Sequence, residues 1–218
     1  MVRNRRQRRI AVNKQTGMVR VTVMERYATT VRQTTETQVE VAILIDGRGK
    51  AEVSSGIPFF DHMLSLFAKH GFFDLTIRAQ GDLEVDFHHT VEDVGLVLGE
   101  TITKALGDRS GIRRYGYAVT PMDDALAAAA VDLSNRPFLV LNAPEALPRE
   151  TGFGIALSRE FFRALVNNCG MNLHINVAYG DNEHHVLEAM FKSLARALDA
   201  ATGFDERIQG PMSTKGCF

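Results

Sequence analysis

The sequence predicts an α+β protein made of two similar halves, because the same order of elements and motifs occurs twice. The segment Ile77–Asp82 resembles Ile175–Asp181 with one residue inserted, and a His-His-x-x-Glu motif follows each of them. Each half combines strand-like and helix-like patterns, so its sheet needs helices to cover one face. We therefore expect duplicated β-β-α-β-α half-domains that form two four-stranded sheets with a helical bundle packed between them.

The individual elements follow from periodicity. Residues 37–45 alternate polar and apolar side chains before an Asp-Gly turn, and residues 50–54 can return as the second strand of a hairpin. Apolar residues at helical spacing predict helices over residues 59–69 and 88–106, with a strand at 74–79 between them. The second half repeats this order. Its strands are expected near residues 124–131, 137–142 and 172–178, and its helices around residues 157–168 and 183–200.

Composition narrows the class of protein. A chain of 218 residues with 45% hydrophobic residues is long and apolar enough for a globular core. A net charge of −1 provides no overall field that favours nucleic acid or membranes as partners. Two cysteines do not suggest a disulfide framework and no apolar run has the length of a membrane span, so we expect a cytoplasmic protein. We assign residues 1–25 to a basic N-terminal extension, 26–107 to the first repeat, and 108–218 to the second repeat with a C-terminal substrate-binding tail.

The two His-His-x-x-Glu motifs, at residues 88–92 and 184–188, predict metal binding. On a helix, one imidazole of each pair can share a side with the glutamate, while the adjacent histidine points about 100° away. One such motif alone can be an exposed polar cap, but a second copy favours a shared chemical role. The candidate ligands are His88, His89, Glu92, His184, His185 and Glu188.

Two further histidines are candidate ligands. His62 and His174 lie between apolar residues, where an unpaired imidazole would be costly. Thr76 aligns with His174, so these histidines are not equivalent and we expect two similar but non-identical sites. Imidazole and carboxylate ligands without thiolates do not distinguish manganese, iron, zinc and cobalt. About three histidines and one glutamate per ion leave open coordination positions, which favours catalysis over structural bracing.

Short segments with distinctive sequences occur in order between about residue 26 and the C-terminus: Phe59–Leu64, His88–Gly95, Pro121–Asp123, Asp132–Arg136, Leu173–Ile175, His184–Glu188, Phe191–Lys192 and Ser213–Gly216. Together they resemble the signature set of the imidazoleglycerol-phosphate dehydratase family. The resemblance implies a hydro-lyase that converts a phosphorylated imidazole substrate, imidazole glycerol phosphate, to imidazole acetol phosphate in histidine biosynthesis, with two manganese ions (Mn²⁺) per active site. It also implies half-domains like domain 2 of ribosomal protein S5, in a homo-oligomer of twenty-four subunits with active sites at subunit contacts.

The chemistry of this reaction explains which residues are needed. The C2 proton of the substrate is weakly acidic and the neighbouring hydroxyl leaves poorly, so metals on both ring nitrogens, an imidazolate and a diazafulvene-like intermediate are implied. A carboxylate must remove the C2 proton, and Glu36 matches the family glutamate implicated in that step. From the residues alone, an exposed acid at a strand edge is the simpler interpretation of Glu36. Asp93 and Asp123 are candidates to orient ligand histidines.

The substrate phosphate requires cationic side chains and small hydrogen-bond donors. The residues that fall in the family's matching segments are Arg114, Arg136, Lys192, Ser213 and Lys215. Arg113 remains an alternative to Arg114. The order Pro211, Met212, Ser213 differs from the family pattern, which leaves the register of the tail open.

Two other classes of function share some of these features. A dinuclear phosphatase usually has a carboxylate that bridges its metals, whereas this sequence supplies mostly imidazoles. A ferritin-like storage bundle uses Glu-x-x-His pairs on four helices, without the strands expected here. Release of inorganic phosphate, formation of a keto product or inert metal loading would separate the three functions.

Overall fold

The computed structural model describes residues 25–144, 147 and 152–214. The first repeat contains strands β1 (Tyr27–Gln33), β2 (Thr37–Leu44), β3 (Ala51–Ser54) and β4 (Asp74–Gly81), with helices α1 (Pro58–His70) and α2 (His88–Leu106). The second repeat contains strands β5 (Tyr115–Met122), β6 (Ala125–Asp132), β7 (Phe138–Asn142) and β8 (Asn172–Tyr179), with helices α3 (Ile155–Cys169) and α4 (Glu183–Thr202). Both repeats have the order β-β-β-α-β-α, so the duplication expected from the sequence is confirmed.

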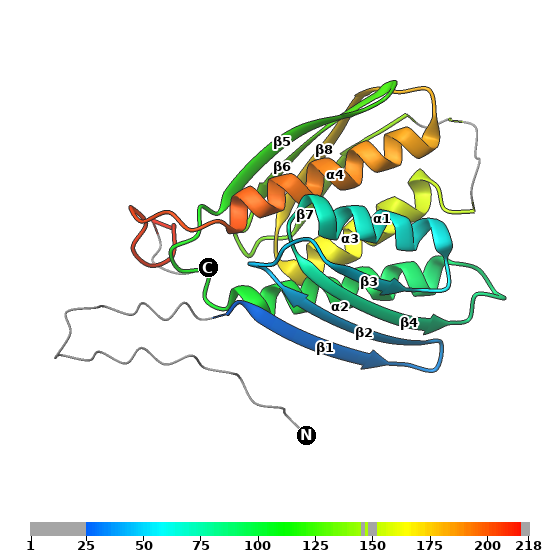
Figure 1. Ribbon diagram of the computed structural model, residues 1–218, viewed down its shortest axis with the longest axis horizontal. Coiled ribbons are helices and arrows are strands. Elements are labelled where there is room, and N and C mark those ends of the chain that lie inside the picture. Colours follow the sequence, from blue (N-terminus) through cyan, green and yellow to red (C-terminus); the bar gives the residue numbers. More distant parts are fainter. Residues whose placement is uncertain (1–24, 145–146, 148–151, 215–218) are drawn as a thin grey trace.

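Each repeat forms one four-stranded sheet, with the strand orders β1-β2-β4-β3 and β5-β6-β8-β7. Figure 1 shows the two sheets on the outside of the molecule and the helices between them. Alternate residues of the central strands, such as Val39 and Val41 of β2, are fully buried against the helices. The predicted architecture of two sheets around a helical layer is therefore confirmed.

The predicted element order was wrong in one respect, because it lacks the first strand of each repeat. β1 and β5 are edge strands that pair only with β2 and β6, and each has a single buried residue, Thr30 or Thr120. A strand with so little buried surface carries no clear apolar alternation, so periodicity does not reveal it. The strand at residues 51–54 exists, but it pairs in parallel with β4 instead of returning as a hairpin beside β2.

The single inserted residue of the second repeat lies near the end of β8. Tyr179 pairs with Leu126 and Val177 pairs with Ala127, so Ala178 is an extra residue at a break in the register. An irregularity of this kind adds one residue without disturbing the rest of the strand pair. β8 therefore leads to the motif that opens α4 as β4 leads to the motif that opens α2.

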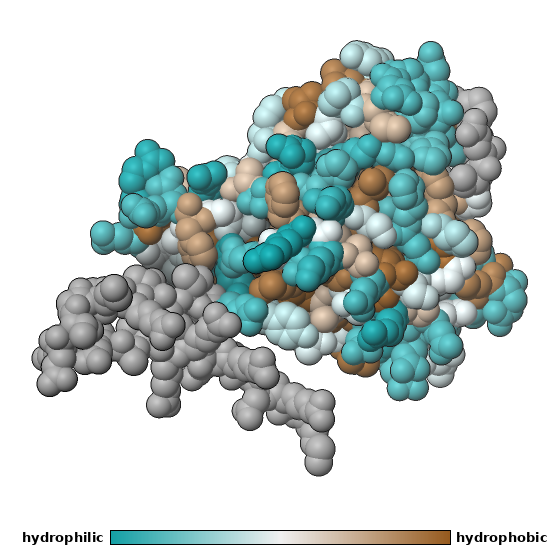
Figure 2. Space-filling view, viewed as in Figure 1, coloured by the Kyte–Doolittle hydropathy of each residue, from teal (hydrophilic) through white to brown (hydrophobic). Residues whose placement is uncertain are grey.

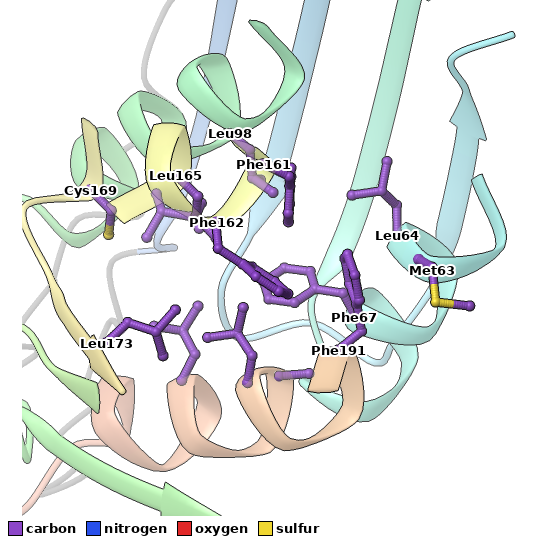
Figure 3. Close-up of a cluster of buried hydrophobic side chains, with 14 of the residues drawn as sticks. Met63, Leu64, Phe67, Leu98, Phe161, Phe162, Leu165, Cys169, Leu173 and Phe191 are labelled. Carbon is purple, nitrogen blue, oxygen red and sulfur yellow. The ribbon is translucent and has the colours of Figure 1, made fainter. Parts of the chain in front are cut away.

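Helices from both repeats form the hydrophobic core. Figure 3 shows Phe67 of α1, Phe162 of α3 and Phe191 of α4 meeting between the sheets. The rings of Phe161 and Phe191 are stacked with centroids 5.5 Å apart, which joins α3 to α4. Helices α2 and α3 approach closely at Gly95, where an added Cβ atom would lie 2.6 Å from the carbonyl oxygen of Phe161. The core therefore holds the two helices that carry the motifs in fixed positions.

The helices that carry the two motifs both begin at one end of the molecule. Helices α2 and α4 begin at the same end, where the β1–β2 and β5–β6 turns also lie, and the segment 203–214 lies at the opposite end (Figure 1). The fold thus brings both motifs to one end. Within the described residues, no helix is both long enough and apolar enough to cross a membrane.

Candidate metal centre

Three ligand-type side chains converge where α1 meets the start of α4. The Nε2 atoms of His62 and His184 lie 3.1 and 2.9 Å from the same atom, Oε1 of Glu188. One ligand atom from each of these residues lies within 4.8 Å of the others. His184 and Glu188 are one helical turn apart, and α1 packs against α4 so that His62 faces both of them. The group therefore combines ligands from the two repeats.

The Glu188 carboxylate is surrounded by three side chains that hydrogen-bond to it. It is buried, and its second oxygen contacts Nζ of Lys192 one turn later. Burial by itself raises the pKa of this carboxyl, but hydrogen bonds from Lys192, His62 and His184 outweigh that effect and lower the pKa to about 2. The ring of Phe59 packs edge-on against His184, with centroids 4.9 Å apart, and limits rotation of that imidazole. Glu188 is therefore ionised at neutral pH, as a metal ligand must be.

This donor set fits a divalent transition-metal ion. Two imidazole nitrogens and one carboxylate oxygen suit manganese, iron or zinc, and the group contains no thiolate that would favour a softer ion. Both imidazoles already point at one carboxylate oxygen, so small shifts would let all three donors face a common ion. Three protein ligands leave coordination positions for substrate or for ligands from elsewhere.

The first motif forms a looser group at the start of α2. Nε2 of His88 lies 3.7 Å from Oε2 of Glu92, and both side chains are about half exposed. Nδ1 of His89 hydrogen-bonds to the two oxygens of Asp82, at 3.0 and 3.3 Å, and this contact raises the pKa of His89. Oε2 of Glu36 lies 3.9 Å from the same nitrogen. The first motif therefore lies beside the proposed proton acceptor.

His185 of the second motif has a comparable set of partners. Its Nδ1 hydrogen-bonds to Asp124, and its Nε2 lies 3.4 Å from Oδ2 of Asp123. Asp124 also accepts the backbone amides of Asp181 and Asn182, at 2.7 and 3.1 Å. The hydrogen bond from His185 and these two amides hold the pKa of Asp124 well below its usual range, and Asp124 in turn raises the pKa of His185. The carboxylate of Asp124 is thus ionised and held in place.

The carboxylates that contact the second histidine of each motif, Asp82 and Asp124, are not among the residues expected from the sequence. Asp82 belongs to the Gly-Asp pair that ends the repeated strand pattern, but the matching pair contains Asp181, so the repetition alone does not show which aspartate contacts a histidine. Asp93, which the sequence suggests as a partner of a ligand histidine, instead accepts hydrogen bonds from Thr37 and Arg32. Asp93 therefore braces the start of β2 against α2.

The expectation that His62 and His174 are buried was wrong, because both side chains are exposed. The side chain of His62 is 47% exposed. In the view of Figure 1, Figure 2 shows mostly hydrophilic side chains over α1 and α4. His174 alternates with the buried Leu173 and Ile175 in β8, so it points to the outer face of the sheet. One chain does not bring His174 to the group around His62, and its role as a ligand stays a prediction.

Arg114 already has several partners within the chain. Its guanidinium donates two hydrogen bonds to Asp132, at 2.6 and 3.0 Å, and a third to the carbonyl oxygen of Met212, at 2.6 Å. These contacts place Arg114 next to Ser213 in the C-terminal segment. Two of the predicted phosphate ligands therefore lie together.

The other predicted phosphate ligands are dispersed. Arg136 is exposed in the turn between β6 and β7, and Arg113, the alternative to Arg114, is also exposed. Lys192 is bound to the metal group through Glu188. Lys215 lies outside the described residues.

The metal group and Arg114 lie near opposite ends of α4. The backbone amide of Arg114 donates to the carbonyl oxygen of Ala201, thirteen residues beyond Glu188 in the same helix. At 1.5 Å per residue this corresponds to about 20 Å. One chain therefore does not gather the metal group and the Arg114–Ser213 pair around a single small ligand.

The fold and these side chains define the class of protein, which is an α+β protein built from two repeats with a group of side chains that could hold a metal ion. The model of the imidazoleglycerol-phosphate dehydratase family matches residues 55–198, a segment that includes both motifs and His62. The chain therefore belongs to the imidazoleglycerol-phosphate dehydratase family, and the resemblance found in its sequence is confirmed.

Individual relatives agree with this assignment. The imidazoleglycerol-phosphate dehydratase of Desulfosudis oleivorans is 68% identical over 194 residues, which cover 89% of this chain and all of that protein. The enzyme of Geobacter sulfurreducens is 55% identical over 193 residues, which cover 88% of this chain and 99% of that protein.

Solved structures of the same family show the same fold. The dehydratase from Pyrococcus furiosus has a TM-score of 0.76 and 38% identity, and the match covers 87% of this chain and 100% of that structure. The one from Staphylococcus aureus has a TM-score of 0.72 and 37% identity, with 82% and 99% covered. Family membership makes the chain a hydro-lyase of histidine biosynthesis.

Proposed function

We propose that this chain removes water from imidazole glycerol phosphate to give imidazole acetol phosphate, with two manganese ions in an active site shared between subunits. The observation that carries the proposal is the convergence of His62, His184 and Glu188, which joins ligands from both repeats in a member of a dehydratase family. The first motif supplies a second set of imidazole and carboxylate donors. Two motifs thus provide ligands for two ions.

Every proposed metal ligand comes from the two motifs or from the two additional histidines. One ion is assigned to the group of His62, His184 and Glu188. The remaining proposed ligands are His88, His89, Glu92, His174 and His185. Bound manganese would supply Lewis-acid chemistry at the nitrogens of the substrate imidazole, which makes the ring easier to deprotonate. The choice of manganese over iron, zinc or cobalt rests on the family resemblance.

Glu36 is proposed to accept the C2 proton of the substrate. Its side chain is 56% exposed, and Oε2 lies 3.9 Å from Nδ1 of His89, outside hydrogen-bond distance. The carboxylate is therefore available to a ligand bound at the first motif. A carboxylate in this position can take the proton from carbon and hold it at oxygen while the enol forms.

The phosphate is proposed to bind a cationic group drawn from more than one chain. That group consists of Arg114, Arg136, Lys192, Ser213 and Lys215. The three-carbon chain between the imidazole ring and the phosphate is too short to span the distance of about 20 Å along α4 between the metal group and the Arg114–Ser213 pair. A second copy would therefore complete the site, as in the twenty-four-subunit assembly that the resemblance implies.

The surface is compatible with such an assembly. The edge strand β5 exposes the large apolar side chains of Tyr115, Tyr117 and Val119, each at least 47% accessible. Grouped apolar side chains on a surface commonly mark sites of protein association. A cytoplasmic location is also proposed, because two cysteines are too few for a disulfide-stabilised protein.

Metal analysis combined with turnover tests the proposal. Glu92→Gln and Glu188→Gln are each expected to abolish turnover and to weaken manganese retention, because each removes a charged ligand. Glu100→Gln, which lies further along α2, is the control and should retain both properties. The wild-type product should be a ketone, without release of inorganic phosphate. Full activity with normal manganese content in either ligand variant would contradict the two-site proposal, and phosphate release would favour a hydrolase.

A further inference from the structure

We propose that Asp82 and Asp124 are positioning residues that hold His89 and His185 for metal binding. The two repeats use carboxylates at different positions for this purpose. This exchange of positions leaves Glu36 free for proton transfer. This inference rests on the proposed function of the two motifs. It assigns a role to two aspartates that the motif spacing does not include.

Asp124 is fixed from two directions. One carboxylate oxygen, Oδ1, accepts a hydrogen bond from Nδ1 of His185, and the other, Oδ2, accepts the backbone amides of Asp181 and Asn182. The side chain of Asn182 accepts the backbone amide of His185 at 3.2 Å, so the turn before α4 and the start of the helix are connected. An ionised carboxylate can only accept, so Nδ1 of His185 carries the proton and Nε2 is left for a metal. A second acid, Asp123, lies 3.4 Å from Nε2 of His185, and its side chain is 68% exposed.

Asp82 has the same relation to His89 in the first repeat. Both of its oxygens lie within 3.3 Å of Nδ1 of His89, and its side chain is only 20% exposed. The same ring nitrogen is therefore engaged in both repeats. A ligand histidine commonly donates its other ring N–H to a carboxylate, which fixes the orientation and tautomer of the ring.

The two aspartates do not occupy equivalent positions in the repeats. Asp124 directly precedes β6, and the residue that directly precedes β2 is Glu36. Asp82 directly follows Gly81 at the end of β4, and its counterpart after Gly180 is Asp181. The histidine partner therefore comes from the strand end in the first repeat and from the hairpin in the second.

The exchange explains why Glu36 lies near a histidine without binding it. Asp82 already satisfies Nδ1 of His89, and Glu36 stays 3.9 Å away with more than half of its side chain exposed. Asp124, at the matching hairpin position, is committed to His185 and to two amides. One copy of the duplicated carboxylate thus orients a histidine, and the other is available to the substrate.

The experiment measures manganese affinity of the full-length protein by titration with the metal alone. Asp82→Asn and Asp124→Asn are expected to bind manganese about 10- to 100-fold more weakly, because an amide neither fixes the tautomer nor raises the basicity of the imidazole. The matched controls are Glu84→Gln and Asp181→Asn, which remove an exposed charge from the same two turns and should leave the affinity unchanged.

Two further variants keep the test decisive. Asp124→Glu retains a carboxylate, so its affinity should lie closer to wild type than that of Asp124→Asn. Glu36→Gln should bind manganese normally but turn over slowly. Normal affinity in both Asn variants, or equal weakening in the Glu and Asn variants at position 124, would overturn the positioning role. Normal turnover in Glu36→Gln would instead remove the base from the proposed function and leave the metal-affinity result to decide the positioning role separately.

Discussion

Glu36 is held by its backbone while its carboxylate stays exposed. The hydroxyl oxygen of Thr34 accepts the amides of Glu36 and Thr37, at 3.2 and 2.9 Å, which fixes the turn between β1 and β2. The side chain then extends toward His89 without a hydrogen bond to it. A fixed backbone with an available carboxylate suits a group that must meet a substrate proton at a defined place.

Glu36→Gln tests the proton-transfer role at the residue scale. Gln keeps the size of the side chain but cannot act as a base, so kcat should fall by about 10²- to 10⁴-fold with a modest change in KM. Bound manganese should remain at the wild-type level. Kinetics, metal analysis and exchange of deuterium at substrate C2 are measured on the same preparation. A matching loss of manganese would make Glu36 a metal ligand, and wild-type turnover would exclude it from the mechanism.

At the scale of elements, two glycines allow α2 to lie close to α3. A Cβ atom at Gly99 would lie 2.6 Å from the carbonyl oxygen of Leu165 and 2.9 Å from the amide nitrogen of Cys169. The conflict is with backbone atoms, which cannot turn away as a flexible side chain can. The position of α2, and with it the first motif, therefore depends on the absence of side chains at Gly95 and Gly99.

Gly99→Ala is expected to destabilise the protein although alanine favours helices. Overpacking of a close contact typically costs about 1–3 kcal/mol, which exceeds the helix-propensity gain of about 1 kcal/mol. The melting temperature should fall by roughly 2–4 °C for each kcal/mol of net loss. Glu100→Ala, the next residue along α2, is the control, because it removes only a surface ion pair with Lys104. An unchanged or higher melting temperature for Gly99→Ala would show that the helices separate at little cost.

At the scale of the whole molecule, the metal group and the Arg114–Ser213 pair lie at different ends. The metal group is at the start of α4, and Arg114 contacts the last turn of that helix and the C-terminal segment. Figure 1 shows this segment at the end of the molecule opposite to the starts of α2 and α4. A site shared between copies is the arrangement that lets one small substrate use both groups.

Subunit complementation tests the shared site. Glu188→Gln is expected to impair the proposed metal group. Arg136→Ala is expected to impair phosphate binding, where loss of a charge-assisted contact should raise KM by roughly 10- to 100-fold. If each active site combines groups from two chains, co-expressed variants should form some sites with no impaired group. Activity of the mixed oligomer should then exceed that of either variant alone. Equal or lower activity, with mixing verified by mass, would place both groups in one chain.

The sequence by itself determined the duplication, the helical start of each His-His-x-x-Glu motif and membership of the family. These features depend on local periodicity and on residue types at fixed spacing, which can be read without knowing how distant segments meet. The inserted residue near the end of β8 could also be read from the repeat, because an insertion shows in the alignment of one half with the other. The edge strands β1 and β5 could not be predicted from the sequence, because each has one buried residue and so gives no periodic signal.

Only the tertiary structure decided which residues act together. It placed His62 of the first repeat beside His184 and Glu188 of the second, because α1 packs against α4. It also paired β3 in parallel with β4, and set Asp124 against His185. Each of these contacts joins segments whose meeting depends on the packing of sheets and helices, and packing between distant segments leaves no fixed spacing in the sequence.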